Sequence, residues 1–113
     1  MEKIIIDKAE DVSVLSQYDS EFIGTIEVYL KDIEEEFEIP SNLVCHILDI
    51  EDCPGLKAIP KTITVKDCLS LKGNHQVKTL PDGFKCKSLI LENLHNLPLH
   101  LDVENIILNS SDI

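Results

Sequence analysis

A proline preceded by isoleucine or leucine recurs four times along the chain, and the residues after it repeat as well. The dipeptide occurs at Ile39-Pro40, Ile59-Pro60, Leu80-Pro81 and Leu97-Pro98. In each of these four units an apolar residue lies three positions after the proline and another lies five positions after it. An apolar-x-apolar triplet then follows. Four units that match at several offsets predict a repeat architecture.

The triplets, counted with two looser matches nearer the N-terminus, start at residues 4, 28, 48, 69, 89 and 106. Their spacings are 24, 20, 21, 20 and 17 residues. Because side chains alternate along a strand, the outer two residues of each triplet should point inward and the middle one outward. One unit cannot bury its apolar side alone, so neighbouring units should stack into a parallel sheet. We expect these residues to form the buried core of the sheet: Leu48, Ile50, Leu69, Leu71, Leu89 and Leu91.

Three residues after a triplet comes a position that can join adjacent turns through side-chain bonds to the backbone. It holds Cys53, Asn74, Leu94 and Ser111 in successive units, and Leu94 cannot make such a bond. The L-x-L-x-x-N/C pattern is that of a leucine-rich repeat. We therefore predict a leucine-rich-repeat-like solenoid that is mainly β, with a parallel sheet on one face and irregular or short helical turns on the other. A right-handed β-helix is the nearest alternative and would show less proline and steadier spacing.

The clearest unit combines Leu80-Pro81-Asp82-Gly83-Phe84-Lys85-Cys86 with the triplet Leu89-Ile90-Leu91. It resembles the short, proline-containing leucine-rich repeats (LPxxL type) of bacterial effectors and, more closely, those of small proteins of large tailed phages. The likeness covers about residues 26–111 and implies an architecture more than a function. Effector versions carry a ligase domain with a catalytic Cys-x-Asp, which none of the four cysteines here provides. We expect a single repeat domain over 1–113, with 1–25 as an atypical N-terminal capping unit and 26–113 as repeats.

The composition bears on partners and location. The net charge is −11 and every basic residue is lysine, so direct nucleic-acid binding is not expected. The N-terminus does not resemble a signal peptide, and no apolar run is long enough to cross a membrane. We therefore expect reduced cysteines and a cytoplasmic protein, in the host cytoplasm if a phage encodes it.

No residue pattern indicates catalysis. The histidines are scattered and do not follow metal-ligand spacing, so we predict no metal and no cofactor. Cys45 and His46 are neighbours in a predicted strand and should point to opposite faces, which prevents them from acting as nucleophile and base. Cys68, just before its triplet, is the candidate for a reactive thiol. We expect no enzymatic activity.

Two features indicate contact surfaces. The outward middle residues of the triplets are Ile5, Tyr29, Asp49, Ser70, Ile90 and Ile107, four of them apolar or aromatic where a solvated sheet would be polar. Residues 1–40 hold twelve acids and three lysines, a net charge of −9, whereas residues 41–113 have a net charge of −2. The acids are densest at Glu34, Glu35 and Glu36 in a predicted turn. The partner-binding candidates are therefore Tyr29, Asp49, Ser70, Ile90, Ile107, Glu34, Glu35 and Glu36.

Three functions fit these features. The first is a non-enzymatic module that binds a protein partner, for which the net charge favours a basic one, such as a phage- or mobile-element-encoded inhibitor of a host protein. The second is an acidic nucleic-acid mimic that blocks a DNA- or RNA-binding protein. The third is a structural repeat protein that self-assembles through the edge strand near Ile106-Ile107-Leu108.

Overall fold

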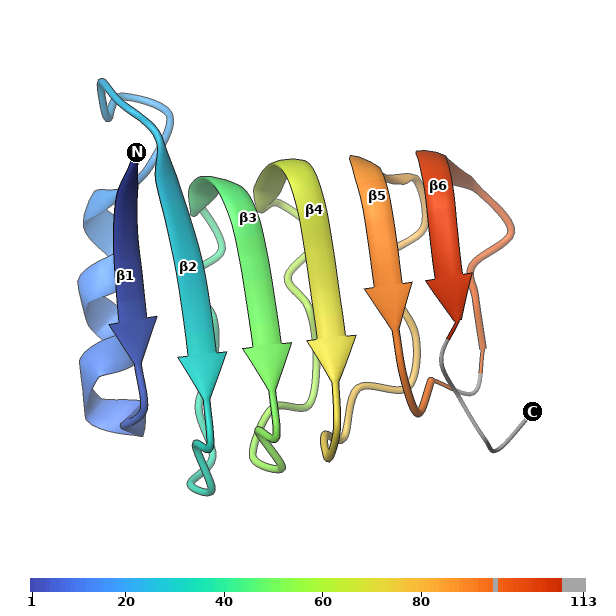
Figure 1. Ribbon diagram of the computed structural model, residues 1–113, viewed down its shortest axis with the longest axis horizontal. Coiled ribbons are helices and arrows are strands. Elements are labelled where there is room, and N and C mark those ends of the chain that lie inside the picture. Colours follow the sequence, from blue (N-terminus) through green and yellow to red (C-terminus); the bar gives the residue numbers. More distant parts are fainter. Residues whose placement is uncertain (95, 109–113) are drawn as a thin grey trace.

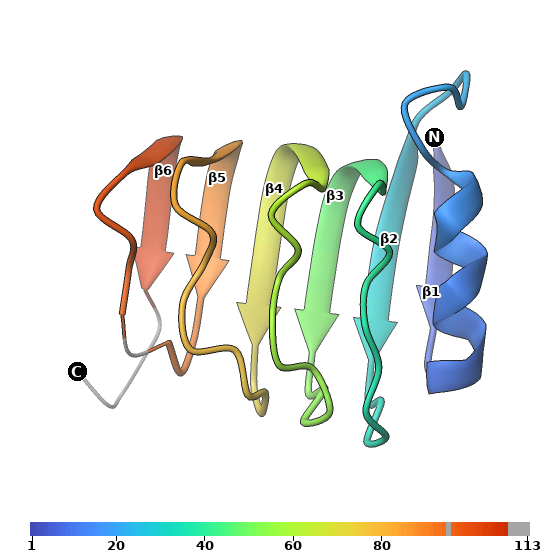
Figure 2. The same cartoon turned by 180° about the vertical axis from the view of Figure 1, so that it is seen from behind.

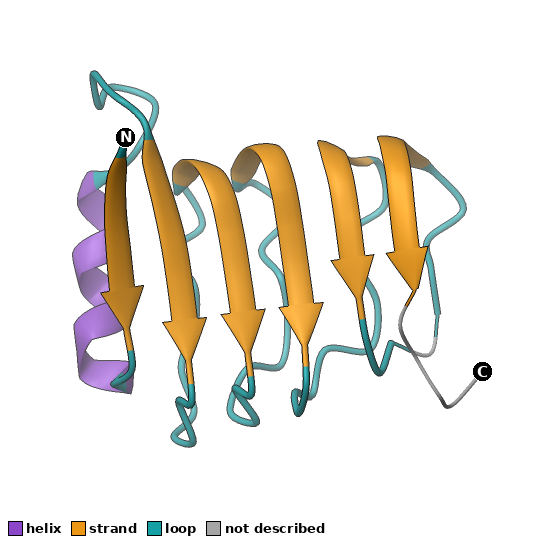
Figure 3. Ribbon diagram, in the orientation of Figure 1, coloured by secondary structure: helices purple, strands orange, loops and turns teal. Residues whose placement is uncertain are grey.

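The chain forms one sheet of six parallel strands, and irregular segments return along the back of the sheet (Figures 1 and 3). The computed structural model describes residues 1–94 and 96–108. The strands pair in chain order, so each repeat contacts its sequence neighbours, as in a solenoid. The elements are β1 (Glu2–Ile6), the 3-10 helix η1 (Ala9–Gln17), β2 (Ile26–Lys31), β3 (Val44–Glu51), β4 (Thr64–Lys72), β5 (Phe84–Leu91) and β6 (Leu101–Leu108).

The predicted solenoid and its core are confirmed. The outer triplet residues of β3, β4 and β5 point inward and are almost fully buried: Leu48, Ile50, Leu69, Leu71, Leu89 and Leu91. They lie in register across the sheet, so equivalent residues stack on one another from strand to strand. The stacking explains why the sequence repeats, because each apolar side chain is buried only when the equivalent side chain of the next unit packs against it.

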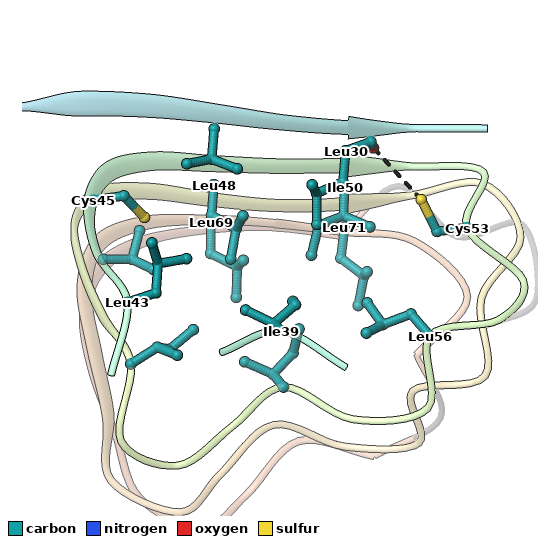
Figure 4. Packing of buried hydrophobic residues seen from close by; sticks show 14 of the residues in the cluster. Leu30, Ile39, Leu43, Cys45, Leu48, Ile50, Cys53, Leu56, Leu69 and Leu71 are labelled. Carbon is teal, nitrogen blue, oxygen red and sulfur yellow. Dashed lines mark hydrogen bonds between the residues drawn. The ribbon is translucent and has the colours of Figure 1, made fainter. Parts of the chain in front are cut away.

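The return segments supply the opposite wall of the core. In Figure 4 the labelled side chains of the strands point toward those of the return segments, including Ile39 and Leu56. The apolar residue of each of the first three Ile/Leu-Pro dipeptides is buried, at Ile39, Ile59 and Leu80. Proline can follow at these positions because the return segments form no continuous ladder that needs its missing N–H.

A turn with a left-handed residue follows four of the strands. Asp32, Asp52, Gly73 and Asn93 each lie two residues after the end of a triplet and have φ between 52° and 70°. Glycine, asparagine and aspartate are the residues that adopt this conformation most readily. The four strands therefore end in the same way although their turns differ in sequence.

The predicted ladder between turns is correct at Cys53 and wrong at Asn74. The Cys53 thiol is buried and donates to the carbonyl of Leu30 at 3.5 Å (Figure 4). Asn74 is exposed, and its backbone N–H donates to the Asp52 carboxylate at 3.1 Å. Side chains at the left-handed position, one residue before the predicted one, therefore also join adjacent turns, as those of Asp52 and Asn93 do. Ser111, the last predicted ladder residue, lies outside the described residues.

The two ends of the solenoid differ. At the N-terminal end η1 covers β1 on the back face of the sheet, which Figure 2 turns toward the reader, and it buries Val12 and Leu15. At the other end, β6 has Ile106, Ile107 and Leu108 exposed by 43%, 48% and 46%. Within residues 1–94 and 96–108, no later element packs against β6. Ile106 and Leu108 therefore occupy core positions that the described chain leaves half open.

Candidate interaction surface

The six outward triplet residues form one straight row across the sheet. Each is the register partner of the next: Ile5, Tyr29, Asp49, Ser70, Ile90 and Ile107. We call this set the outer row. The predicted stacking of neighbouring units implies that Ile90 and Ile107 are neighbours, and the pairing of β5 with β6 confirms it. The outer row therefore brings together side chains from six successive strands.

The ends of the outer row are apolar and accessible. Ile5 is 70% exposed on β1, and Ile107 is 48% exposed on β6. Tyr29 and Ile90 are half-buried next to them. Exposed isoleucines on a sheet face leave apolar area in contact with water, which a partner could cover.

Tyr29 is held in place by its neighbours. Its hydroxyl donates to the Glu27 carboxylate at 2.6 Å, and the Lys31 ammonium lies 5.9 Å from the ring centroid. The hydrogen bond to Glu27 is the main cause of a raised pKa at Tyr29, with desolvation and the charges of Glu27 and Asp49 adding to it. A fixed aromatic ring loses little conformational entropy when a partner covers it.

The centre of the outer row is polar and less accessible than predicted. Ser70 faces outward but is only 4% exposed, because its short side chain lies between Asp49 and Ile90 of the adjacent strands. The Ser70 hydroxyl and one Asp49 carboxylate oxygen are buried without a hydrogen-bond partner among the described residues. Ser70 therefore cannot offer a partner the contact area that the sequence suggested.

A second outward row, two residues earlier in each strand, contributes apolar area that the sequence analysis missed. Ile47 and Cys68 are register partners in this row and are half-buried. The row continues on β5 with the polar Ser88, so it adds apolar area on β3 and β4 only. The alternation of side chains along the strand would have identified Ile47, which stands two residues before Asp49.

The acidic turn lies apart from the outer row, in the return segment after β2. Glu34 and Glu35 are exposed, as predicted. Glu36 forms an ion pair with Lys57 of the next turn, and this contact lowers the pKa of Glu36. The three glutamates are therefore not one free cluster, because a lysine compensates the third.

Gly55 fixes the acidic turn against its neighbour. A Cβ atom at Gly55 would lie 2.1 Å from the carbonyl oxygen of Glu35 and 2.8 Å from the Cα of Glu36. Only glycine permits this close approach of two backbones. Together with the pairing of Phe37 and Leu56, it holds Glu34 and Glu35 on a supported turn.

The structure separates Cys45 from His46, the two neighbours weighed as nucleophile and base. Cys45 is buried in the core, whereas His46 faces outward and pairs with Asp67 at 3.5 Å. Cys68 is the least buried of the four cysteines, but desolvation, with Asp67 and Asp49 adding, raises its pKa and disfavours the nucleophilic thiolate. Among the described residues, no three His, Cys, Asp or Glu side chains could hold a metal ion. His95 lies outside the described residues.

The described residues contain no helix long and apolar enough to cross a membrane. The fold and its exposed surface define a parallel β-solenoid whose sheet presents a partly apolar row. No family model, curated protein or solved structure matches the chain.

Proposed function

We propose that this protein is a non-enzymatic protein-binding module and that the outer row is its main contact surface. The observation that carries the proposal is the alignment of Ile5, Tyr29, Ile90 and Ile107 on one sheet face. A sheet face exposed only to solvent normally carries polar residues in this row. Since the strands beneath are fixed by a continuous core, binding there requires little ordering of the backbone.

The resemblance to short, proline-containing leucine-rich repeats supports a further step. Such repeats in phage and effector proteins suggest a chain encoded by a phage or mobile element that inhibits a host protein in the host cytoplasm. The lysine-only basic composition fits the AT-rich genomes of many phages. The repeat frame supports the architecture, while the side chains of the outer row would determine the partner.

The test compares how much of a partner protein two double variants retain when each is used as bait in a host lysate. Ile90→Asp with Ile107→Asp places charge on the outer row. The control, Ile23→Asp with Leu99→Asp, makes the same change at two almost fully exposed residues elsewhere. We expect wild type and control to retain the same protein at high salt, because apolar contacts are insensitive to screening, and the outer-row variant to lose it. Urea unfolding of each variant verifies that the fold is intact. Equal capture by all three proteins would contradict the outer row as the contact surface.

A second candidate function is mimicry of a nucleic acid. It is favoured by the charge of residues 1–40 and by the exposed Glu34 and Glu35 on their supported turn. Glu34→Lys with Glu35→Lys should then slow association with a basic partner and weaken its salt dependence. The control changes Glu10 and Asp11, which are exposed on η1, by the same total charge. If both variants behave alike, the acids act only through net charge, and the mimicry proposal fails.

A further inference from the structure

The sheet is open between β4 and β5 over the first half of both strands. Their pairing covers only Cys68–Leu71 with Ser88–Leu91. By contrast, β3 pairs with β4 from the first residue of each strand, and so does β5 with β6. Figure 1 shows the ribbons of β4 and β5 diverging toward their N-terminal ends. We call this opening the seam.

One extra residue in β4 accounts for the seam. Four positions separate the inward residue Val65 from the triplet at Leu69, whereas three separate Cys86 from Leu89. The pairing of β3 with β4 shows a register shift at this place, between Cys45 and Ile47. A bulge adds one residue to one strand and bends it. The bulged strand stays paired with β3 and separates from β5.

The seam leaves backbone hydrogen-bonding groups without strand partners. On the closed side, the N–H of Thr64 donates to the carbonyl of Leu43 at 2.9 Å. The equivalent bond one repeat later, from Lys85 to Ile63, is not formed in the part of the chain that the structure describes. Unpaired groups along a strand are a template for pairing with an added peptide.

A groove of about 910 Å³ lies over the seam, within the size range of ligand sites. The apolar residues that line it include Ile63, Val65 and Phe84, which belong to the core and are only 8%, 1% and 5% exposed, so the groove reaches the edge of the core. Such a lining suits a ligand that carries apolar side chains as well as charge.

The groove collects four of the chain's ten lysines: Lys61, Lys66, Lys85 and Lys87. Three acids also line it, at Asp82, Asp102 and Glu104. Lys85 lies 3.9 Å from Asp102, and the other three lysines form no salt bridge within the described residues. In a chain with a net charge of −11, this is a local excess of available positive charge.

We propose that the seam groove binds an extended acidic peptide segment of a partner protein. The peptide backbone pairs with the open groups of β4 and β5, its apolar side chains lie over Ile63 and Phe84, and its carboxylates meet Lys66 and Lys87. An inorganic anion would use the lysines but neither the backbone acceptors nor the apolar lining. The groove does not include the outer row or the acidic turn, so this proposal does not depend on the function proposed above.

The probe is a fluorescein-labelled Glu-Val-Glu-Val-Glu-Val peptide, followed by fluorescence anisotropy with the full chain. We compare Lys66→Glu with Lys87→Glu against Lys8→Glu with Lys78→Glu, two exposed lysines outside the groove. Both pairs change the net charge equally. We expect the groove variant to bind at least about tenfold more weakly and the control to stay within about twofold of wild type, because only the first pair loses close charge contacts.

A deletion tests the backbone contribution separately. Removing Asp67 gives β4 the same spacing as its neighbours while keeping Lys66, so the seam should close, the urea midpoint should rise and peptide binding should be lost. The control is His46→Ala, which removes the same His46–Asp67 contact without shortening the strand and should bind like wild type.

Several results would overturn the proposal. They are no binding by wild type, equal binding of a Lys-Val-Lys-Val-Lys-Val peptide, and unchanged binding by the Asp67 deletion. Inorganic phosphate and chloride are also compared as competitors at the same ionic strength. If phosphate displaces the peptide and chloride does not, the groove is a site for anions and not for a peptide. Sedimentation velocity tests whether the protein self-associates as its concentration rises. If it does, and if the Lys66 and Lys87 changes abolish the association, the groove binds a second copy of the chain.

Discussion

The stability of this solenoid should depend on where along the stack a core residue lies. Leu69 and Ile106 occupy the same repeat position, the first residue of a triplet. Leu69 lies between the layers of β3 and β5 and is fully buried, whereas Ile106 lies in the terminal strand and is 43% exposed. Replacing each with alanine removes side chains of equal size from two environments.

The expected costs follow from burial. Leu69→Ala removes an enclosed side chain and leaves a closed cavity, which should lower the free energy of unfolding by about 2–5 kcal/mol. Ile106→Ala loses only part of the transfer free energy of an isoleucine, and its cavity opens to solvent. Since full burial of an isoleucine contributes roughly 1.5–3 kcal/mol, the partly buried Ile106 should contribute roughly 1–1.5 kcal/mol. Leu99→Ala, at an almost fully exposed residue, serves as the reference and should change stability by less than about 0.5 kcal/mol.

The assay is urea unfolding followed by circular dichroism, at two protein concentrations a hundredfold apart. Equal losses from Leu69→Ala and Ile106→Ala would refute the reasoning, because they would require Ile106 to be enclosed. If the loss from Ile106→Ala grows with protein concentration, a second copy covers β6. If it is large at every concentration, the chain itself covers Ile106.

Three further predictions concern the turns, the buried thiols and the open edge. Gly55→Ala should lower the free energy of unfolding by about 1–3 kcal/mol, because the added Cβ clashes with the neighbouring backbone. Gly83→Ala should lower it by about 1–2 kcal/mol, because Gly83 has open space around it but a φ of +77°. Urea unfolding measures both changes. Burial raises the pKa of Cys45 from 9.0 to about 12. The stability that the buried neutral thiol contributes is therefore complete below pH 9 and is lost as the pH rises toward 12. The slope of this loss is up to about 1.4 kcal/mol per pH unit. Cys45→Ala should be less stable but should lack this part of the alkaline decline, and identical pH profiles would contradict the prediction. Ile107→Lys should reduce any self-association through β6 in sedimentation velocity, and an unchanged dimer fraction would exclude that edge as the interface.

The sequence was sufficient to predict the sheet, its core and the outer row. All of these follow from two periodicities, the alternation within a strand and the spacing between triplets. Leu48, Leu69 and Leu89 are buried for the same local reason, so one unit predicts the next. Repetition makes a fold easy to predict because the same physical requirement is written several times.

The sequence was less informative about contacts that depend on neighbouring side chains. Ser70 faces outward as predicted, but its burial is set by Asp49 and Ile90 on either side. In place of the ladder contact expected from the Asn74 side chain, the Asn74 backbone N–H donates to the carboxylate of Asp52, the left-handed residue of the preceding turn. Neither result could be derived from the type of the residue alone.

The seam shows how these two kinds of information combine. The 21-residue spacing between the triplets at 48 and 69 was visible in the sequence, and it places one extra residue in the unit that contains β4. What the spacing could not reveal is which neighbour would accommodate that residue, since β4 could have separated from either adjacent strand. The structure keeps the ladder to β3, where Val44 pairs with Thr64, and opens the ladder to β5. Backbone bonds given up on that side cost stability unless water or a ligand replaces them. The lysines beside the seam favour an acidic ligand as the group that replaces these backbone bonds. The Asp67 deletion distinguishes such a ligand from water. If only water occupies the seam, closing the seam raises stability and removes no binding activity.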